Sequence, residues 1–182
     1  MVGERFSAWL RGEETEEAPT LRRSLGHSHV LEPDRRTPAG ALQIARKLTA
    51  KAAVRLRKIG YWAGGMSVFV KGRNRLEWER HVKLDEAQDT GTFLKTLVML
   101  WREFPLSASP VQVGVVFAPL ISPGHHNLSL FENPRRERLS QAMDSINERH
   151  GKHTAYYASL SDTFDDAPTR IAFTRVPDLS EY

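Results

Sequence analysis

The spacing of apolar residues predicts one long helix in the first half of the chain. Between Ala41 and Ile59 apolar side chains recur every three or four residues, which places them on one helical face. Thr37 is a favourable N-cap, Pro38 suits the first helical position, and Gly60 suits the end of the helix. We expect the opposite face of this helix to carry Arg46, Lys47, Arg57 and Lys58.

On either side of this helix the period changes to two, which predicts strands. Leu25, His27 and His29 occupy alternate positions, and residues 76–84 alternate between apolar and polar, with Arg80 interrupting the apolar set. The predicted elements are an extended segment over 21–31, the helix over 38–59, strands over 61–71 and 76–84 joined by a turn at 72–75, a helix over 90–104 and a strand over 111–120. This order predicts an α+β fold: an antiparallel four-stranded sheet with two helices on one face and the other face open.

Weaker patterns flank this region. Residues 1–12 read as the end of a helix, and the polar segment "EETEEAPT" at 13–20 follows it. A helix end followed by a linker is typical of the edge of a neighbouring domain, and a frayed terminus is the alternative interpretation.

A third helix is predicted near the C-terminus. Residues 134–150 have helical periodicity, and Gly151 ends the pattern. We expect this helix to turn three apolar residues inward: Leu139, Met143 and Ile146. A small strand extension is predicted beyond it, at 154–158 and 169–174.

Composition narrows the class of protein. The 182 residues are 40% hydrophobic and 26% charged, which is enough to form one core. No apolar run approaches membrane-spanning length, the N-terminus has no signal-peptide core, and there is no cysteine. We therefore expect a cytoplasmic protein without disulfides or cysteine-ligated metals.

Basic residues are concentrated in one block. Residues 22–83 contain 15 lysines and arginines and 4 acidic residues, whereas residues 1–20 contain 2 basic and 5 acidic residues. A basic block that continues from a helix into two strands favours a polyanion as partner. An ordinary solvated helix face is the alternative interpretation.

The chain has few candidates for catalysis or metal binding. Asp162, Asp165 and Asp166 form an acidic cluster, but no apolar strand positions them for Mg²⁺. Four histidines match no four-ligand zinc pattern and are better explained as polar groups able to hydrogen-bond a phosphate: His27, His29, His125 and His126. No phosphate-binding loop or nucleophile elbow is present, so no self-sufficient active site is expected.

The segment "RRSLGHSHVLEPDRRTPAGALQIARKLTAKAAVRLRKIGYWAGGMSVFV" resembles the start of the little-finger domain of bacterial Y-family translesion DNA polymerases. The similarity is to the DinB/UmuC-like, ImpB/MucB/SamB group, in which "SLGHSHVL" corresponds to the first strand of the domain. "GERFSAWLRGE" at 3–13 is similar to the last thumb helix of these enzymes. The resemblance covers most of residues 3–150 and is weaker after Lys152.

This resemblance implies a division of the chain. It implies the end of a thumb helix at 1–12, a tether at 13–23, the little-finger DNA-binding domain at 24–124, a clamp-binding peptide at 125–132, and a C-terminal helix and extension at 133–182. No segment matches the palm carboxylates that bind Mg²⁺ in this family. We therefore expect no cofactor and no polymerase activity from this chain alone, while the parent protein would be a DNA polymerase.

The pentapeptide "NLSLF" is similar to the motif by which such polymerases dock on the β sliding clamp. The implied clamp-binding residues are Asn127, Leu128, Ser129, Leu130 and Phe131. Each buried Leu or Phe side chain would contribute roughly 1.5–3 kcal/mol before ordering costs. Asn127 is one methylene shorter than the family's Gln, which weakens a polar contact. The alternative is that Leu128 and Phe131 pack under the third helix.

The resemblance also implies that the open sheet face lies across the major groove of duplex template–primer DNA while flanking residues hold phosphates. The implied DNA-binding residues are Arg22, Arg23, Ser28, His29, Lys71, Arg73, Arg75 and Arg80. Other SOS repair proteins are further expected partners, and no membrane is involved. Two other functions stay open: a stand-alone, non-catalytic clamp or DNA adaptor in DNA repair, and an RNA-binding module of similar topology.

Overall fold

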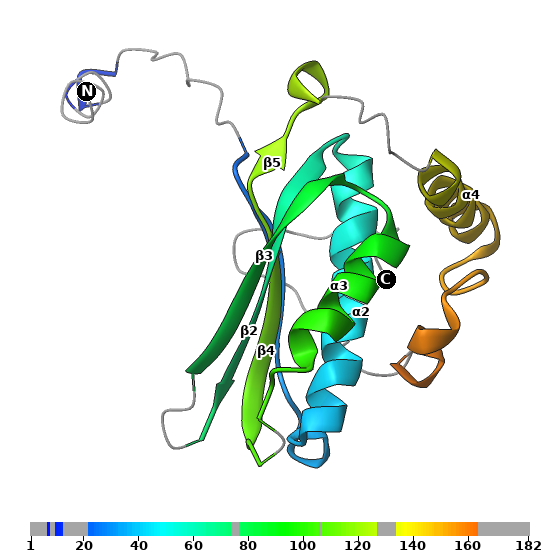
Figure 1. The fold of residues 1–182 in the computed structure, drawn as a ribbon. Coiled ribbons are helices and arrows are strands. Elements are labelled where there is room, and N and C mark those ends of the chain that lie inside the picture. Colours follow the sequence, from blue (N-terminus) through cyan, green and yellow to red (C-terminus); the bar gives the residue numbers. More distant parts are fainter. Residues whose placement is uncertain are drawn as a thin grey trace.

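A computed structural model describes residues 7, 10–12, 22–73, 77–105, 107–126 and 134–163 of the chain. Within these ranges the chain forms one antiparallel sheet. Two helices pack on one face of it, a third helix lies beyond them, and no described element covers the other face (Figure 1). The predicted α+β class is therefore confirmed. None of the described helices is long and apolar enough to cross a bilayer.

The elements follow the predicted order closely. The strands are β1 (Leu25–Val30), β2 (Trp62–Gly72), β3 (Glu77–Ala87), β4 (Pro110–Phe117) and β5 (Leu120–Ile121). The helices are α2 (Pro38–Lys58), α3 (Thr90–Trp101) and α4 (Pro134–His150), with short 3₁₀ turns η1 (Pro33–Arg35), η2 (Pro123–His125) and η3 (Ala158–Thr163). The N-caps form as the sequence requires, because Thr37 Oγ1 accepts from Gly40 N at 3.1 Å and Asp89 Oδ1 accepts from Thr92 N at 2.8 Å.

Several predicted boundaries differ from the structure, and α3 ends at Trp101 rather than at 104. The segment predicted as one strand over 111–120 is two strands, because Pro119 has no N–H to donate to the ladder. β3 continues three residues beyond its predicted end. The strand predicted at 154–158 is wrong, since this segment consists of turns and the start of η3; its predicted partner, 169–174, lies outside the described residues.

The strand order is β1-β4-β2-β3, every neighbouring pair is antiparallel, and β5 extends the sheet beside the start of β2. The central strands are therefore β4 and β2, which are also the most apolar. Their helix-facing side chains are fully buried: Met66, Val68, Val70, Val113, Val115 and Phe117. The edge strands β1 and β3 carry histidines and charged residues, which water can solvate at an edge.

The core lies between this sheet face and the two helices. The predicted apolar face of α2 packs there, with Ile44, Leu48 and Leu56 all buried. From α3, Phe93 stacks on Phe117 with ring centroids 4.0 Å apart. Because each large apolar side chain contributes roughly 1.5–3 kcal/mol on burial, this layer stabilises the sheet. The other face of the sheet takes no part in this packing.

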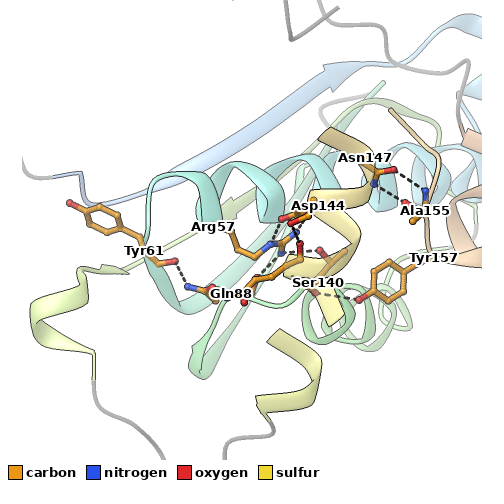
Figure 2. Close-up of polar contacts among 11 residues, drawn as sticks. Arg57, Tyr61, Gln88, Ser140, Asp144, Asn147, Ala155 and Tyr157 are labelled. Atoms are coloured by element: carbon orange, nitrogen blue, oxygen red, sulfur yellow. Dashed lines mark hydrogen bonds and ion pairs between the residues drawn. The ribbon is translucent and has the colours of Figure 1, made fainter. Parts of the chain in front are cut away.

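α4 is attached to this body by polar contacts (Figure 2). The Arg57 guanidinium of α2 donates to both carboxylate oxygens of Asp144, at 2.6 and 2.9 Å, and to the Gln88 carbonyl at 2.8 Å. Thr90 N donates to Ser140 Oγ at 3.2 Å. The alternative interpretation of the basic residues as a solvated helix face therefore does not apply to Arg57, since its side chain is 6% exposed. It turns inward because a carboxylate partner comes from a segment 87 residues away.

The predicted limits of the third helix are confirmed, but its predicted orientation is wrong. Leu139 and Ile146 are exposed rather than inward, and Met143 is only partly buried. Ser140 and Asp144 occupy the inward side instead. Hydrogen bonding to polar groups of α2 and α3 sets the rotation of α4, whereas periodicity alone assumed that apolar burial would do so.

Candidate nucleic-acid interface

The sheet face opposite the helices is composed mainly of small and polar side chains. Alternation and register place two rows of residues across this face. Ser28 of β1 lies beside Gly114 of β4, and in the next row Ser67 of β2 lies between Val116 of β4 and His81 of β3. Ser67 Oγ lies 3.0 Å from His81 Nδ1. A face with such short side chains allows another molecule to approach the strand backbone closely.

Phe69 is the large side chain near the centre of this face. A Cβ added to Gly114 would lie 2.2 Å from Phe69 Cζ, so the ring lies directly over this glycine. Any side chain at position 114 would therefore push the ring outward. The glycine keeps Phe69 flat against the sheet, and the open face stays low in profile.

Positive charge gathers at the two ends of this face rather than across it. Arg22 and Arg23 are exposed just before β1, where the Arg23 carbonyl accepts from Leu120 N at 3.0 Å. Lys71 and Arg73 are exposed at the opposite end, where Arg73 N donates to the Ser109 carbonyl at 3.2 Å. β1 alone is about 17 Å long at roughly 3.4 Å per residue, so the cations at its two ends are at least that far apart.

The β3 side of the face is mixed in charge. Exposed Lys83 is accompanied on the same strand by the exposed acidic residues Glu77, Glu79 and Asp85. A polyanion would therefore be attracted to the ends of the sheet more strongly than to its β3 edge.

The predicted DNA-binding residues do not all lie on this face. Ser28 and Lys71 lie on it, and Arg22, Arg23 and Arg73 flank it, while Arg75 is outside the described residues. Register places His29 beside buried Val113, on the helix side. Sequence reasoning missed the contributions of Phe69, His81, Gln112 and Gly114. The period-two alternation of β2, β3 and β4 is the signal that could have found them.

Arg80 also lies on the helix side of the sheet. It pairs with buried Val68, its Nε lies 2.6 Å from Glu103 Oε2, and its guanidinium carbon is 5.5 Å from the centroid of the Trp78 ring. The position of Arg80 within the apolar set of β3 already pointed to this side. Its charge is therefore engaged by Glu103 and an indole at the β3 edge.

The pKa of His27 reflects the electrostatic environment between β1 and α2. Burial, and to a smaller extent the nearby cations Arg55 and Lys51, lower its pKa from 6.5 to about 4. His27 is therefore neutral at neutral pH and faces the basic side of α2.

In the described part of the chain, no three metal-ligating side chains come together to form a metal site.

The predicted clamp-binding residues, 127–131, lie outside the described residues, but the chain on both sides of them is described. The His126 ring stacks on Trp62 with centroids 4.0 Å apart, and its Nδ1 lies 2.6 Å from Glu86 Oε2. In the first turn of α4, Glu137 Oε1 accepts from Trp62 Nε1 at 3.1 Å. A single indole at the start of β2 therefore holds the chain both before and after this segment.

Comparison with known families identifies the class of protein that this fold belongs to. Residues 22–130 match the family described as the impB/mucB/samB family C-terminal domain. Because the match spans more than half of the chain, the chain belongs to this family. Its sheet and two helices form the little-finger domain of Y-family DNA polymerases.

Similar solved structures come from polymerases of the same class. They include an insertion ternary complex of Dbh DNA polymerase (14% identity, TM-score 0.47), a Y-family DNA polymerase chimera (15%, 0.49) and a second Dbh ternary complex with partially disordered substrates (14%, 0.47). Each alignment covers 66% of this chain and 36% of the other chain. The chain thus spans about a third of the length of the polymerases it matches.

Proposed function

We propose that this chain is the C-terminal DNA-binding and clamp-binding portion of a Y-family translesion DNA polymerase, which holds template–primer DNA without sequence specificity. The observation that supports this most directly is the uncovered sheet face, with short side chains across it and cations at both ends. Membership of the little-finger family supports the same function. Catalysis would belong to palm carboxylates that the described residues do not supply.

In the proposed mechanism the sheet face enters the major groove, which is about 12 Å wide. The two cationic ends, separated by at least the roughly 17 Å length of β1, would then reach phosphates on either side of the groove. Contacts to phosphates position the duplex and carry little sequence information. A damaged template could therefore be held in the same way as an intact one.

Charge reversal at one end of the face tests the placement of DNA. For Lys71→Glu/Arg73→Glu we expect at least a tenfold weaker affinity for a primer–template duplex, because two phosphate contacts become repulsive. Fluorescence anisotropy with a labelled duplex measures this effect. The matched control is Lys58→Glu/Lys95→Glu, which reverses two exposed charges on the helices behind the sheet and should bind nearly as well as wild type.

If both double variants weakened DNA binding equally, the affinity would depend only on the net charge of the protein, and the proposed DNA-binding face would be wrong. The same assay with single-stranded RNA addresses the alternative function. Tighter binding to single-stranded RNA than to the duplex would favour the RNA-binding module.

Clamp binding is tested separately, with purified sliding clamp. For Leu130→Ala/Phe131→Ala we expect loss of clamp retention in a pull-down, because the two anchoring side chains of the pentapeptide are removed. Ser129→Ala is the matched control and should be retained like wild type. Retention of the double variant at the wild-type level would remove the clamp from the proposed function without affecting the DNA-binding part.

A further inference from the structure

α4 docks through polar residues and leaves apolar ones in solvent. Ser140 is 1% exposed, Asp144 pairs with Arg57, and the Asn147 side chain makes two hydrogen bonds of 2.8 Å with the Ala155 backbone. By contrast, Leu139 is 52% exposed and Ile146 is 41% exposed. Surface helices normally bury their apolar side. Packing among the described residues therefore does not account for the apolar residues of α4.

The exposed apolar residues share one face of the helix. Leu139, Met143 and Ile146 are spaced four and three residues apart, so they lie in one row about 10 Å long. We name this row the α4 stripe. The hydrogen bonds of Ser140 and Asp144 fix the rotation of the helix, so the stripe keeps its direction relative to the sheet.

The charged residues of α4 are likewise divided between its inward and outward sides. Two of its carboxylates turn inward, since Glu137 accepts from Trp62 and Asp144 pairs with Arg57. Arg138 and Arg149 are exposed and, at 100° per residue, fall on the solvent-facing border of the stripe. The outward surface is thus an apolar row with a basic border, and it is complementary to an apolar surface bordered by carboxylates.

The stripe is also continuous with the proposed clamp-binding segment. α4 begins three residues after Phe131, and its first turn is bonded to the same Trp62 that stacks on His126. A row of three side chains is too small for a two-fold dimer, because a specific interface buries at least about 1,000 Å². It is sufficient to extend a peptide contact that already exists.

We propose that the α4 stripe is a second contact with the sliding clamp, against an apolar, acid-bordered surface beside the pocket that takes the pentapeptide. This proposal rests on the proposed function. The pentapeptide anchors the chain, and the stripe fixes the direction in which the little finger leaves the clamp. A partner contact also explains why α4 keeps apolar residues that the described part of the fold does not bury.

The test compares two double variants of the full chain by surface plasmon resonance on immobilised clamp. Leu139→Glu/Ile146→Glu places carboxylates on the stripe, and we expect an affinity about tenfold weaker, mainly through faster dissociation. Gln141→Glu/Ser145→Glu adds the same charge at exposed positions of α4 away from the stripe and should bind within about twofold of wild type. Leu139→Ser/Ile146→Ser separates the loss of apolar contact from repulsion and should also weaken binding.

The outcomes separate the two proposals. If Leu130→Ala/Phe131→Ala weakens clamp binding but both stripe variants bind like wild type, the stripe proposal fails and the proposed function stands. If the Leu130/Phe131 variant also binds like wild type, the clamp assignment itself fails. Light scattering gives a further test. If the wild type is a dimer that the stripe variants disrupt, the stripe binds a second copy of this chain and the proposal is overturned. Unchanged circular dichroism and melting of each variant exclude misfolding as the cause.

Discussion

At the scale of single residues, His27 shows how position changes chemistry. The sequence predicted a polar strand residue able to hydrogen-bond a phosphate. The register instead turns it toward α2, where burial and then the charges of Arg55 and Lys51 lower its pKa to about 4. A neutral imidazole does not add to the positive charge of the domain.

This shift predicts a loss of stability in mild acid. The unfolded chain takes up a proton at His27 near pH 6.5, whereas the folded chain does so near pH 4. The stabilisation is therefore fully present above pH 6.5 and is lost as the pH falls toward 4. It amounts to at most about 3 kcal/mol, reduced by the partial exposure of the ring.

Urea unfolding at pH 7.5 and pH 4.5 measures this effect. The wild type should lose more stability between the two pH values than His27→Gln, which has no proton to bind at this position. A variant with the same pH dependence as the wild type would show that other groups are responsible.

At the scale of elements, α4 shows that amphipathic spacing sets the limits of a helix but not always its rotation. Its ends at Pro134 and His150 follow the sequence. Its inward side is set by Asp144, which meets a buried guanidinium, and by Ser140, which meets the N-terminus of α3. A buried charge requires a partner, and this requirement outweighs the burial of two apolar side chains at the surface.

Removing the carboxylate at Asp144 should therefore weaken the whole domain. For Asp144→Ala we expect a loss of about 2–4 kcal/mol in the free energy of unfolding, because Arg57 stays buried with fewer partners. Glu148→Ala, which changes an exposed carboxylate on the same helix, should cost less than about 0.5 kcal/mol. Equal losses for the two variants would show that the Arg57 pair does not hold α4 in place. Chemical denaturation of both variants at pH 7 provides the comparison.

At the scale of the whole molecule, the charge distribution predicts how DNA binding responds to salt. Four described cations flank the open face: Arg22, Arg23, Lys71 and Arg73. If each holds one phosphate, the logarithm of the affinity should fall against the logarithm of salt concentration with a slope of about −3 to −4. Raising salt from 50 to 200 mM would then weaken binding roughly 100-fold. Anisotropy titrations across this range measure the slope, and a value near zero would exclude phosphate contacts as the source of affinity.

The sequence by itself determined the element order, the limits of α2 and α4 to within a residue, the start of α3 and the apolar sides of α2 and α3, because these depend on local spacing, caps and breakers. It also indicated the family through its first strand and helix. Only the tertiary structure decided that β4 and β2 are central, that Arg57 and Arg80 are paired on the helix side, and that α4 faces outward. These features depend on partners distant in sequence, such as Asp144 for Arg57, which no local pattern contains. The candidate DNA face divides in the same way: local alternation predicted an open face, but strand pairing decided which cations lie beside it.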